Sequence, residues 1–234
     1  MPYAEGDPIR RQAELDALFL IGGVLLTFIA GYINVTSLMY FHVPVSHMSG
    51  VVSKISQDMA LRDFHDMGRM AFIFGGFFAG ATFSGFLIGG GNYKPRLEYC
   101  FVLLLESLFL LVALVLFKLQ WNFGLVFVSM ACGLQNAMAS SYMGLIVRTT
   151  HMTGIVTDIG VLLGQSLKQG RFKAWKILFL SALLGGFFSG GFVALLIYRL
   201  ISFYGLILPS LLCIGVAAAF YGLRVLPELR RIPA

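Results

Sequence analysis

Long apolar stretches, separated by short polar segments, make up most of the chain. Each stretch approaches or exceeds the length of about 20 residues that a helix needs to cross a bilayer, and Glu106 is the only charged residue inside any of them. The pattern therefore predicts an all-α, polytopic membrane protein. The six predicted spanning helices are residues 17–41, 70–91, 100–117, 119–147, 177–198 and 200–223.

The composition agrees with this pattern. Hydrophobic residues make up 58% of the 234 residues and charged residues 12%, whereas about 25% of the residues in a soluble domain are charged. An ordinary soluble protein is therefore excluded. Six spans leave no room for a separate water-soluble catalytic domain, so we predict a single transmembrane domain over residues 1–234.

The distribution of basic residues predicts the topology. With six spans, 12 of the 17 Lys and Arg residues fall on one side of the membrane and 5 on the other. Because cytoplasmic loops carry the excess, both termini are predicted to be cytoplasmic. Residues 1–16 lack the positive region of a cleaved signal peptide, so the first span should remain as an anchor. The cations form no basic face, which excludes nucleic acid as a partner.

Two segments after the first and fourth predicted spans differ from ordinary loops. Residues 42–53 and 149–157 are nearly free of charge, and each leads into a short helical pattern, 51–60 and 155–167. Both helices are too short to cross. We interpret them as half-helices or re-entrant segments, with an interfacial amphipathic helix as the alternative. Non-helical backbone at membrane depth requires protein or a watery cavity around it.

Three short sequences recur in the same order in the two halves of the chain. The longest match shares five of ten residues, and three more positions exchange Ser for Thr or Val for Ile. Repeat one, 17–118, and repeat two, 119–223, each hold three predicted spans, so the second must enter the membrane from the opposite side. We predict an inverted-topology repeat, as in secondary transporters whose substrate site lies between the repeats. The matched segments are residues 31–34 with 133–136, 47–56 with 151–160, and 75–80 with 185–190.

Parts of these segments resemble a known family. Ser-His-Met-Ser-Gly at 46–50, Gly-Leu-Gln-Asn at 133–136 and Arg-Thr-Thr-His-Met-Thr-Gly at 148–154 are similar to motifs of the YoaK-like family of uncharacterised bacterial membrane proteins, called domain of unknown function 1275. The resemblance covers most of the chain and implies a multi-pass protein of the bacterial inner membrane. The family pattern has Asp where this chain has Asn34, and Thr-Gly-Asn at 49–51. Both differences remove polar or titratable groups here and argue against proton coupling through those positions.

The pairs Ser49-Gly50 and Thr153-Gly154 are expected to begin the two short helices. A hydroxyl there can cap free amides, and glycine lets backbone approach a ligand closely. Helix amino termini also attract anions. One interpretation is an anionic or carboxylate-bearing solute held between the two helix starts, and the other is ordinary capping.

The neighbouring His47 and His151 are expected to form hydrogen bonds near this site. Imidazole also suits soft metals, but no further His or Cys cluster completes a coordination shell. The three cysteines, Cys100, Cys132 and Cys213, are widely separated in apolar runs, which favours buried small hydrophobes over a disulfide framework or a metal site. No metal or cofactor is expected.

Polar residues inside the predicted spans are further candidates. Asn34, Gln135 and Asn136 lie in apolar surroundings, where an amide must find a partner. They either line the solute pathway or hold the bundle together through hydrogen bonds between helices.

Three charged residues are candidates for ion coupling. Lys54 and Asp158 occupy equivalent positions of the two repeats and would face each other if the short helices meet; the alternative places both at the level of the lipid headgroups. Glu106 should be protonated, paired or exposed to a cavity, because burying it as an anion is costly.

Two small-residue ridges are predicted to pack helices closely. Gly76 and Gly80 form one GxxxG pair, and Gly186 and Gly190 form the other. Such ridges permit close helix crossing, either between the two repeats or between two copies of the chain in a homodimer.

The function predicted from these features is a small secondary transporter or permease for an organic solute, with alternating access between inverted repeats. A channel or facilitator is the first alternative. An intramembrane enzyme using His47 or His151 beside Ser49 or Thr153, and a non-transporting assembly subunit, are the others. No phosphate loop, zinc-binding His-Glu-x-x-His or nucleophile elbow supports an enzyme.

Overall fold

The computed structural model describes residues 8–89, 97–140, 149–170, 172 and 174–225. The described residues contain α-helices, two short helical segments of other types and no strands, which confirms the predicted all-α class. The elements are α1 (Pro8–Phe41), α2 (Met48–Leu61), α3 (Phe64–Ile88), α4 (Leu97–Lys118), α5 (Gly124–Ser140), α6 (Met152–Gln169), α7 (Ala174–Ile201), the 3₁₀ segment η1 (Ser202–Leu206), α8 (Ile207–Phe220) and the π segment η2 (Tyr221–Val225).

Four helical stretches of the described residues are long and apolar enough to cross a bilayer. The fourth is 50 residues long and includes both α7 and α8, and Gly124–Ala139 in α5 is apolar but shorter. Six separate spans therefore remain a prediction, and the predicted ends at residues 91 and 147 lie outside the described residues. The four stretches are Leu20–Phe41, Phe64–Ile88, Leu97–Lys118 and Ala174–Leu223.

The fourth predicted span begins later than expected. The chain between α4 and α5 forms a turn in which Gln120 has a φ of 63° and the Trp121 amide donates to the Leu116 carbonyl at 2.9 Å. Helix α5 therefore begins at Gly124 rather than Leu119. The turn is rich in apolar and aromatic side chains, so the hydrophobic pattern continues across it without a visible break.

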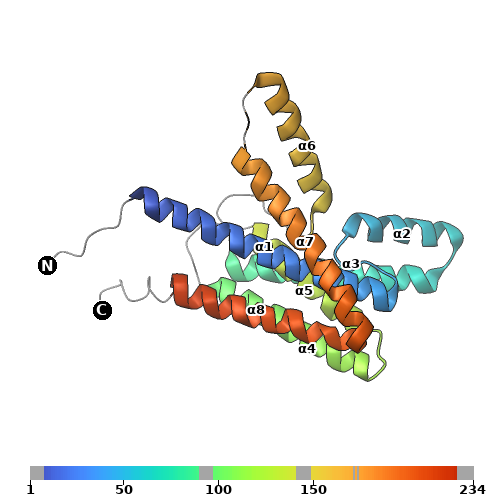
Figure 1. Cartoon of the computed structure of the whole chain (residues 1–234). Coiled ribbons are helices and arrows are strands. Elements are labelled where there is room, and N and C mark those ends of the chain that lie inside the picture. The colour runs from blue at the N-terminus through green and yellow to red at the C-terminus, as the bar shows by residue number, and fades with distance from the viewer. Residues whose placement is uncertain (1–7, 90–96, 141–148, 171, 173, 226–234) are drawn as a thin grey trace.

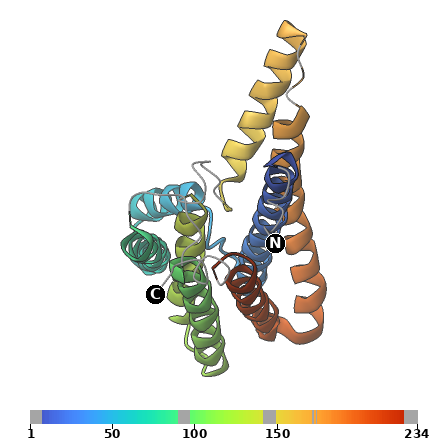
Figure 2. The same cartoon turned by 90° about the vertical axis from the view of Figure 1, so that its left-hand side faces the viewer.

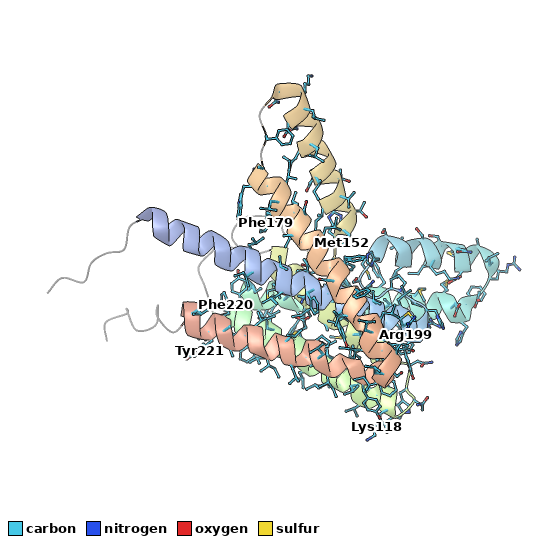
Figure 3. The ribbon with its side chains drawn as sticks, viewed as in Figure 1. Lys118, Met152, Phe179, Arg199, Phe220 and Tyr221 are labelled. Atoms are coloured by element: carbon cyan, nitrogen blue, oxygen red, sulfur yellow. The ribbon has the colours of Figure 1, made fainter. Side chains whose placement is uncertain are left out.

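The long helices run between two ends of one bundle. In Figure 1, α1, α4 and α7 run towards one end, and α3, α5 and α8 run towards the other. The start of α1 and the end of α8 therefore lie at the same end. Lys118 and Arg199 lie at the opposite end, away from Phe220 and Tyr221 (Figure 3).

The principal pairings connect the first part of the chain with the second. Helix α1 packs along α7, α3 packs along α5, and α4 packs against both α5 and α8 (Figure 2). The Tyr32 hydroxyl donates to the Gly205 carbonyl at 2.9 Å and thereby ties α1 to η1. An apolar core between α1, α4, α5 and α8 contains Ile29, Leu110 and Val128.

Glycines permit the two closest helix pairings. A methyl group at Gly190 would overlap the carbonyl oxygen of Phe28 on α1, and one at Gly80 would overlap that of Met130 on α5. Gly186 and Gly76 face the same two partner helices. Both predicted ridges therefore pack inside one chain, and in this structure they are covered rather than offered to a second copy.

The outer faces of the long helices are apolar. Phe86 and Leu200 are each 82% exposed, and Phe101 and Phe188 are also exposed. Apolar surface of this extent is unusual in a soluble monomer and is consistent with contact with a lipid bilayer.

Candidate functional site

The segment between α1 and α2 is non-helical but buried. Val45 and Ser46 are nearly inaccessible, and the Ser129 hydroxyl of α5 donates to the Val45 carbonyl at 3.3 Å. Helix α1 ends at Phe41, since His42 has a φ of 59° and the Arg69 guanidinium of α3 binds the Phe41 carbonyl at 2.6 Å. The chain thus turns back into the protein before α2 begins.

Asn34 on α1 holds this returning segment. Its Oδ1 accepts hydrogen bonds from the Ser46 amide at 3.3 Å and from the Ser46 hydroxyl at 2.8 Å. Both residues are buried. The apolar surroundings of Asn34 predicted that its side chain needs a hydrogen-bond partner, and that partner is Ser46, just before the short helix α2.

The second half of the chain repeats this arrangement. Oδ1 of Asn136 on α5 accepts from the Thr150 amide at 3.3 Å and from the Thr150 hydroxyl at 3.0 Å. We call these two sets of bonds, Asn34 with Ser46 and Asn136 with Thr150, the asparagine clamps. Neither Ser46 nor Thr150 was singled out by the sequence, although a hydroxyl residue precedes the histidine in both copies of the motif.

Histidines are the cap residues of both short helices. Helix α2 begins at Met48 and α6 at Met152, with His47 and His151 before them, and neither histidine side chain makes a capping hydrogen bond. The first helical bonds run from Val51 to His47 and from Ile155 to His151, each at 3.1 Å. Amides of a first turn have no partner within their own helix.

The predicted capping by Ser49 and Thr153 is therefore wrong. Both residues lie inside the first turn, because helical geometry already starts at Met48 and Met152, two residues after the clamped Ser46 and Thr150. Ser49, Gly50 and Thr153 are exposed, and Gly154 is half-buried.

The two histidines differ in their surroundings. Nδ1 of His47 lies 3.3 Å from both Asn34 Oδ1 and Ser46 Oγ, and its ring meets Phe187 edge-on at 5.8 Å between centroids. Burial lowers the pKa of His47 below its usual value, which favours the neutral ring. His151 is exposed, and its ring lies against Gly154 instead.

The short helices diverge from a shared region. In Figures 1 and 2 the first turns of α2 and α6 point towards the same central part of the molecule, and the two helices then separate without contacting each other. Lys54 does not face Asp158 in this arrangement. Its Nζ lies 2.6 Å from Asp58 Oδ1, and this hydrogen bond raises the pKa of Lys54, whereas Asp158 is exposed.

Asp58 was missed by the sequence analysis. It is 1% exposed, and its Oδ2 has no hydrogen-bond partner among the described residues. Asp58 is a charged residue in a short helix that mixes polar and apolar residues, so nothing in the pattern indicated that its side chain is buried.

A separate buried polar group lies where α4, α5 and α8 meet. Glu106 is fully buried, and neither carboxyl oxygen has a hydrogen-bond partner among the residues that the structure describes. The thiols of Cys132 on α5 and Cys213 on α8 are its titratable neighbours. Gln135, one turn after Cys132, is also fully buried, and in the described part of the chain neither its Oε1 nor its Nε2 has a hydrogen-bond partner.

A model of the family described as protein of unknown function (DUF1275) matches residues 22–219. The chain belongs to the DUF1275 family. Comparisons with curated proteins and with solved structures found no match. The matched range of DUF1275 contains the residues of both asparagine clamps and Glu106, so the whole candidate site lies within it.

The candidate site of this DUF1275 protein therefore consists of two parts. The first contains the asparagine clamps, His47 and the first turns of α2 and α6; the second is the buried group around Glu106. Within the described residues, no cluster of three or more His, Cys, Asp or Glu side chains is arranged to hold a metal.

Proposed function

We propose that this DUF1275 protein is a small secondary transporter of the bacterial inner membrane, built from the inverted repeats 17–118 and 119–223 with both termini cytoplasmic. The observation that carries the proposal is the pair of asparagine clamps, which hold two equivalent segments as they turn into α2 and α6. Buried, non-helical segments beside short helices are the usual setting of a transporter's binding site.

The directions of equivalent helices support an inverted repeat. Helices α1 and α5 begin the two halves and run in opposite directions, as do α3 and α7, and α4 and α8 (Figure 1). Equivalent glycines also have equivalent surroundings: a methyl group at Gly31 would overlap the Phe187 carbonyl, and one at Gly133 would overlap the Phe77 carbonyl. Two similar halves of this kind can exchange conformations and thereby expose a central site to alternate sides.

The first turns of α2 and α6 favour an anionic or zwitterionic organic solute. Their amides lack helical partners and carry the positive end of the helix dipole. Gly50 is exposed, and a side chain added there would meet open space. Backbone and ligand can approach each other closely at such a position.

The experiment is a thermal-shift screen of the purified protein against carboxylates, amino acids and sugars, followed by uptake into liposomes. A bound solute raises the melting temperature by mass action. We expect a carboxylate-bearing solute to do so and to accumulate only under an ion gradient. Passage without a gradient would assign a channel or facilitator instead, and absence of both binding and passage would refute the proposal.

Gly50→Leu tests the location of the site. A Cβ atom at Gly50 meets nothing within 4 Å, so we expect the variant to fold, but the leucine covers the first turn of α2 and should abolish both the thermal shift and uptake. Gly160→Leu is the matched control, because Gly160 also faces open space, further along α6. Retention of binding in Gly50→Leu would place the site elsewhere.

A further inference from the structure

Glu106 lies between the two halves of the chain. It belongs to α4, the last helix of residues 17–118, whereas the thiols beside it belong to α5 and α8 of residues 119–223. Helix α4 packs along both of these helices. Any relative movement of the two halves must therefore change the surroundings of this carboxyl group.

Among the described residues, no cationic group lies beside Glu106 to neutralise an anion. The titratable groups facing it are Cys132 from α5 and Cys213 from α8, and the thiol of Cys213 lies close to the carboxyl group without meeting hydrogen-bond geometry. Helix α3 and the segments η1 and η2 also contact α4, and the described side chains of these elements bring no charged partner to Glu106. An unpaired buried carboxylate is strongly disfavoured, so the neutral acid is the form that fits this packing.

We propose that Glu106 is a proton-binding site that locks the α4, α5 and α8 interface. With the proton bound, the three helices pack as observed. Loss of the proton creates a carboxylate that needs water or a cation, so the interface must open to supply it. The proposal relies on the proposed function only for the statement that this opening is coupled to solute movement.

The two buried thiols provide the readout. Cys132 is 1% exposed and Cys213 is 0% exposed, so a small neutral alkylating reagent reaches them only when the interface opens. One linked proton changes the open population by at most about tenfold per pH unit. We therefore expect labelling of both thiols in the wild-type protein, followed by mass spectrometry, to rise several-fold more between about pH 6 and about pH 9 than thiol ionisation explains.

Two references measure thiol ionisation by itself. Glu106→Gln keeps the shape of the neutral acid and should show only the ionisation effect, and wild-type protein unfolded in detergent supplies the same reference if that variant does not fold. A negative Glu106 in a closed interface disfavours neighbouring thiolates and would lower the labelling. A rise above the reference therefore reports opening.

Glu98→Gln is the matched control on the same helix. Glu98 lies in the first turn of α4 and is partly exposed, so this variant should keep the wild-type pH response. A flat or falling wild-type ratio to the unfolded reference overturns the proposal. Closing of the interface by sodium at constant pH would overturn it too, because the site would then bind sodium.

The experiment uses no solute, so its outcome is independent of the transport assay. A protein that transports a solute but shows pH-independent labelling would keep the proposed function and lose the proton site. A protein that binds and transports none of the tested solutes, but whose labelling depends on pH, would keep the proton site and lose the proposed function.

Discussion

Asparagine side chains hold both returning segments of the chain. One Oδ1 atom receives two hydrogen bonds in each clamp, from the amide and the hydroxyl of Ser46 or of Thr150. Apolar surroundings predicted that Asn34 and Asn136 need partners, but not which ones, because Ser46 is 12 and Thr150 is 14 residues away. Only the reversal of the chain brings them together.

Replacing Asn34 by Ala should destabilise the protein. The buried donors of Ser46 lose their acceptor, and an unsatisfied buried group costs about 1–3 kcal/mol. Reversible unfolding in detergent measures the change. Thr82→Ala is the control, because its hydroxyl donates to the Phe78 carbonyl on the exposed side of α3 and its loss should change the free energy of unfolding by less than about 0.5 kcal/mol. Equal losses in both variants would show that the clamp adds nothing.

The helices show which features the pattern of residues can predict. A long, mainly apolar stretch indicated each of α3, α4 and α7, since a bilayer-spanning helix must be long and apolar. Apolar length failed to reveal the α4–α5 turn, because the residues of that turn are themselves largely apolar. Capping residues failed to locate the starts of α2 and α6, because Ser49 and Thr153 look like caps but lie inside the first turn. The partners of the glycine ridges depend on the tertiary arrangement and could not be read from spacing.

Glycine substitutions test the packing between helices. Gly80→Ala places a methyl group against the Met130 carbonyl, and overpacking of this kind costs about 1–3 kcal/mol. Gly75→Ala, five residues earlier on α3, meets open space and should stabilise the helix by up to about 1 kcal/mol. Melting temperatures of the two variants should therefore move in opposite directions. A shift in the same direction would contradict the observed α3–α5 contact.

At the scale of the whole molecule, the two ends of the bundle predict accessibility. The turn between α2 and α3 and the end of α4 lie at the end opposite to the start of α1 (Figure 1). Leu61 and Leu119 are exposed there, at 69% and 56%. If both termini are cytoplasmic, Leu61→Cys and Leu119→Cys should react with a membrane-impermeant maleimide in spheroplasts, whereas a tag at either terminus should stay protected from added protease.

The outcome distinguishes between topologies. Protection of both cysteines combined with cleavage of the tags would show that the orientation is opposite to the predicted one. Labelling of only one cysteine would show that the two positions do not lie on the same side of the membrane, which contradicts the bundle. The native thiols Cys100, Cys132 and Cys213 are buried, so the wild-type protein supplies the unlabelled background.

The two closest helix pairs each join a helix of the first half to a helix of the second half, and this pairing has a consequence for biosynthesis. The glycine-lined face of α1 fits α7, and that of α3 fits α5, so the helices synthesised first have no mate until the later ones leave the ribosome. Helices α1 and α3 must therefore remain in the membrane for a time with their glycine-lined faces unpacked, and during that time a chaperone or insertase can bind those faces. Neither half expressed alone can complete its packing, and only both together have the surfaces to assemble.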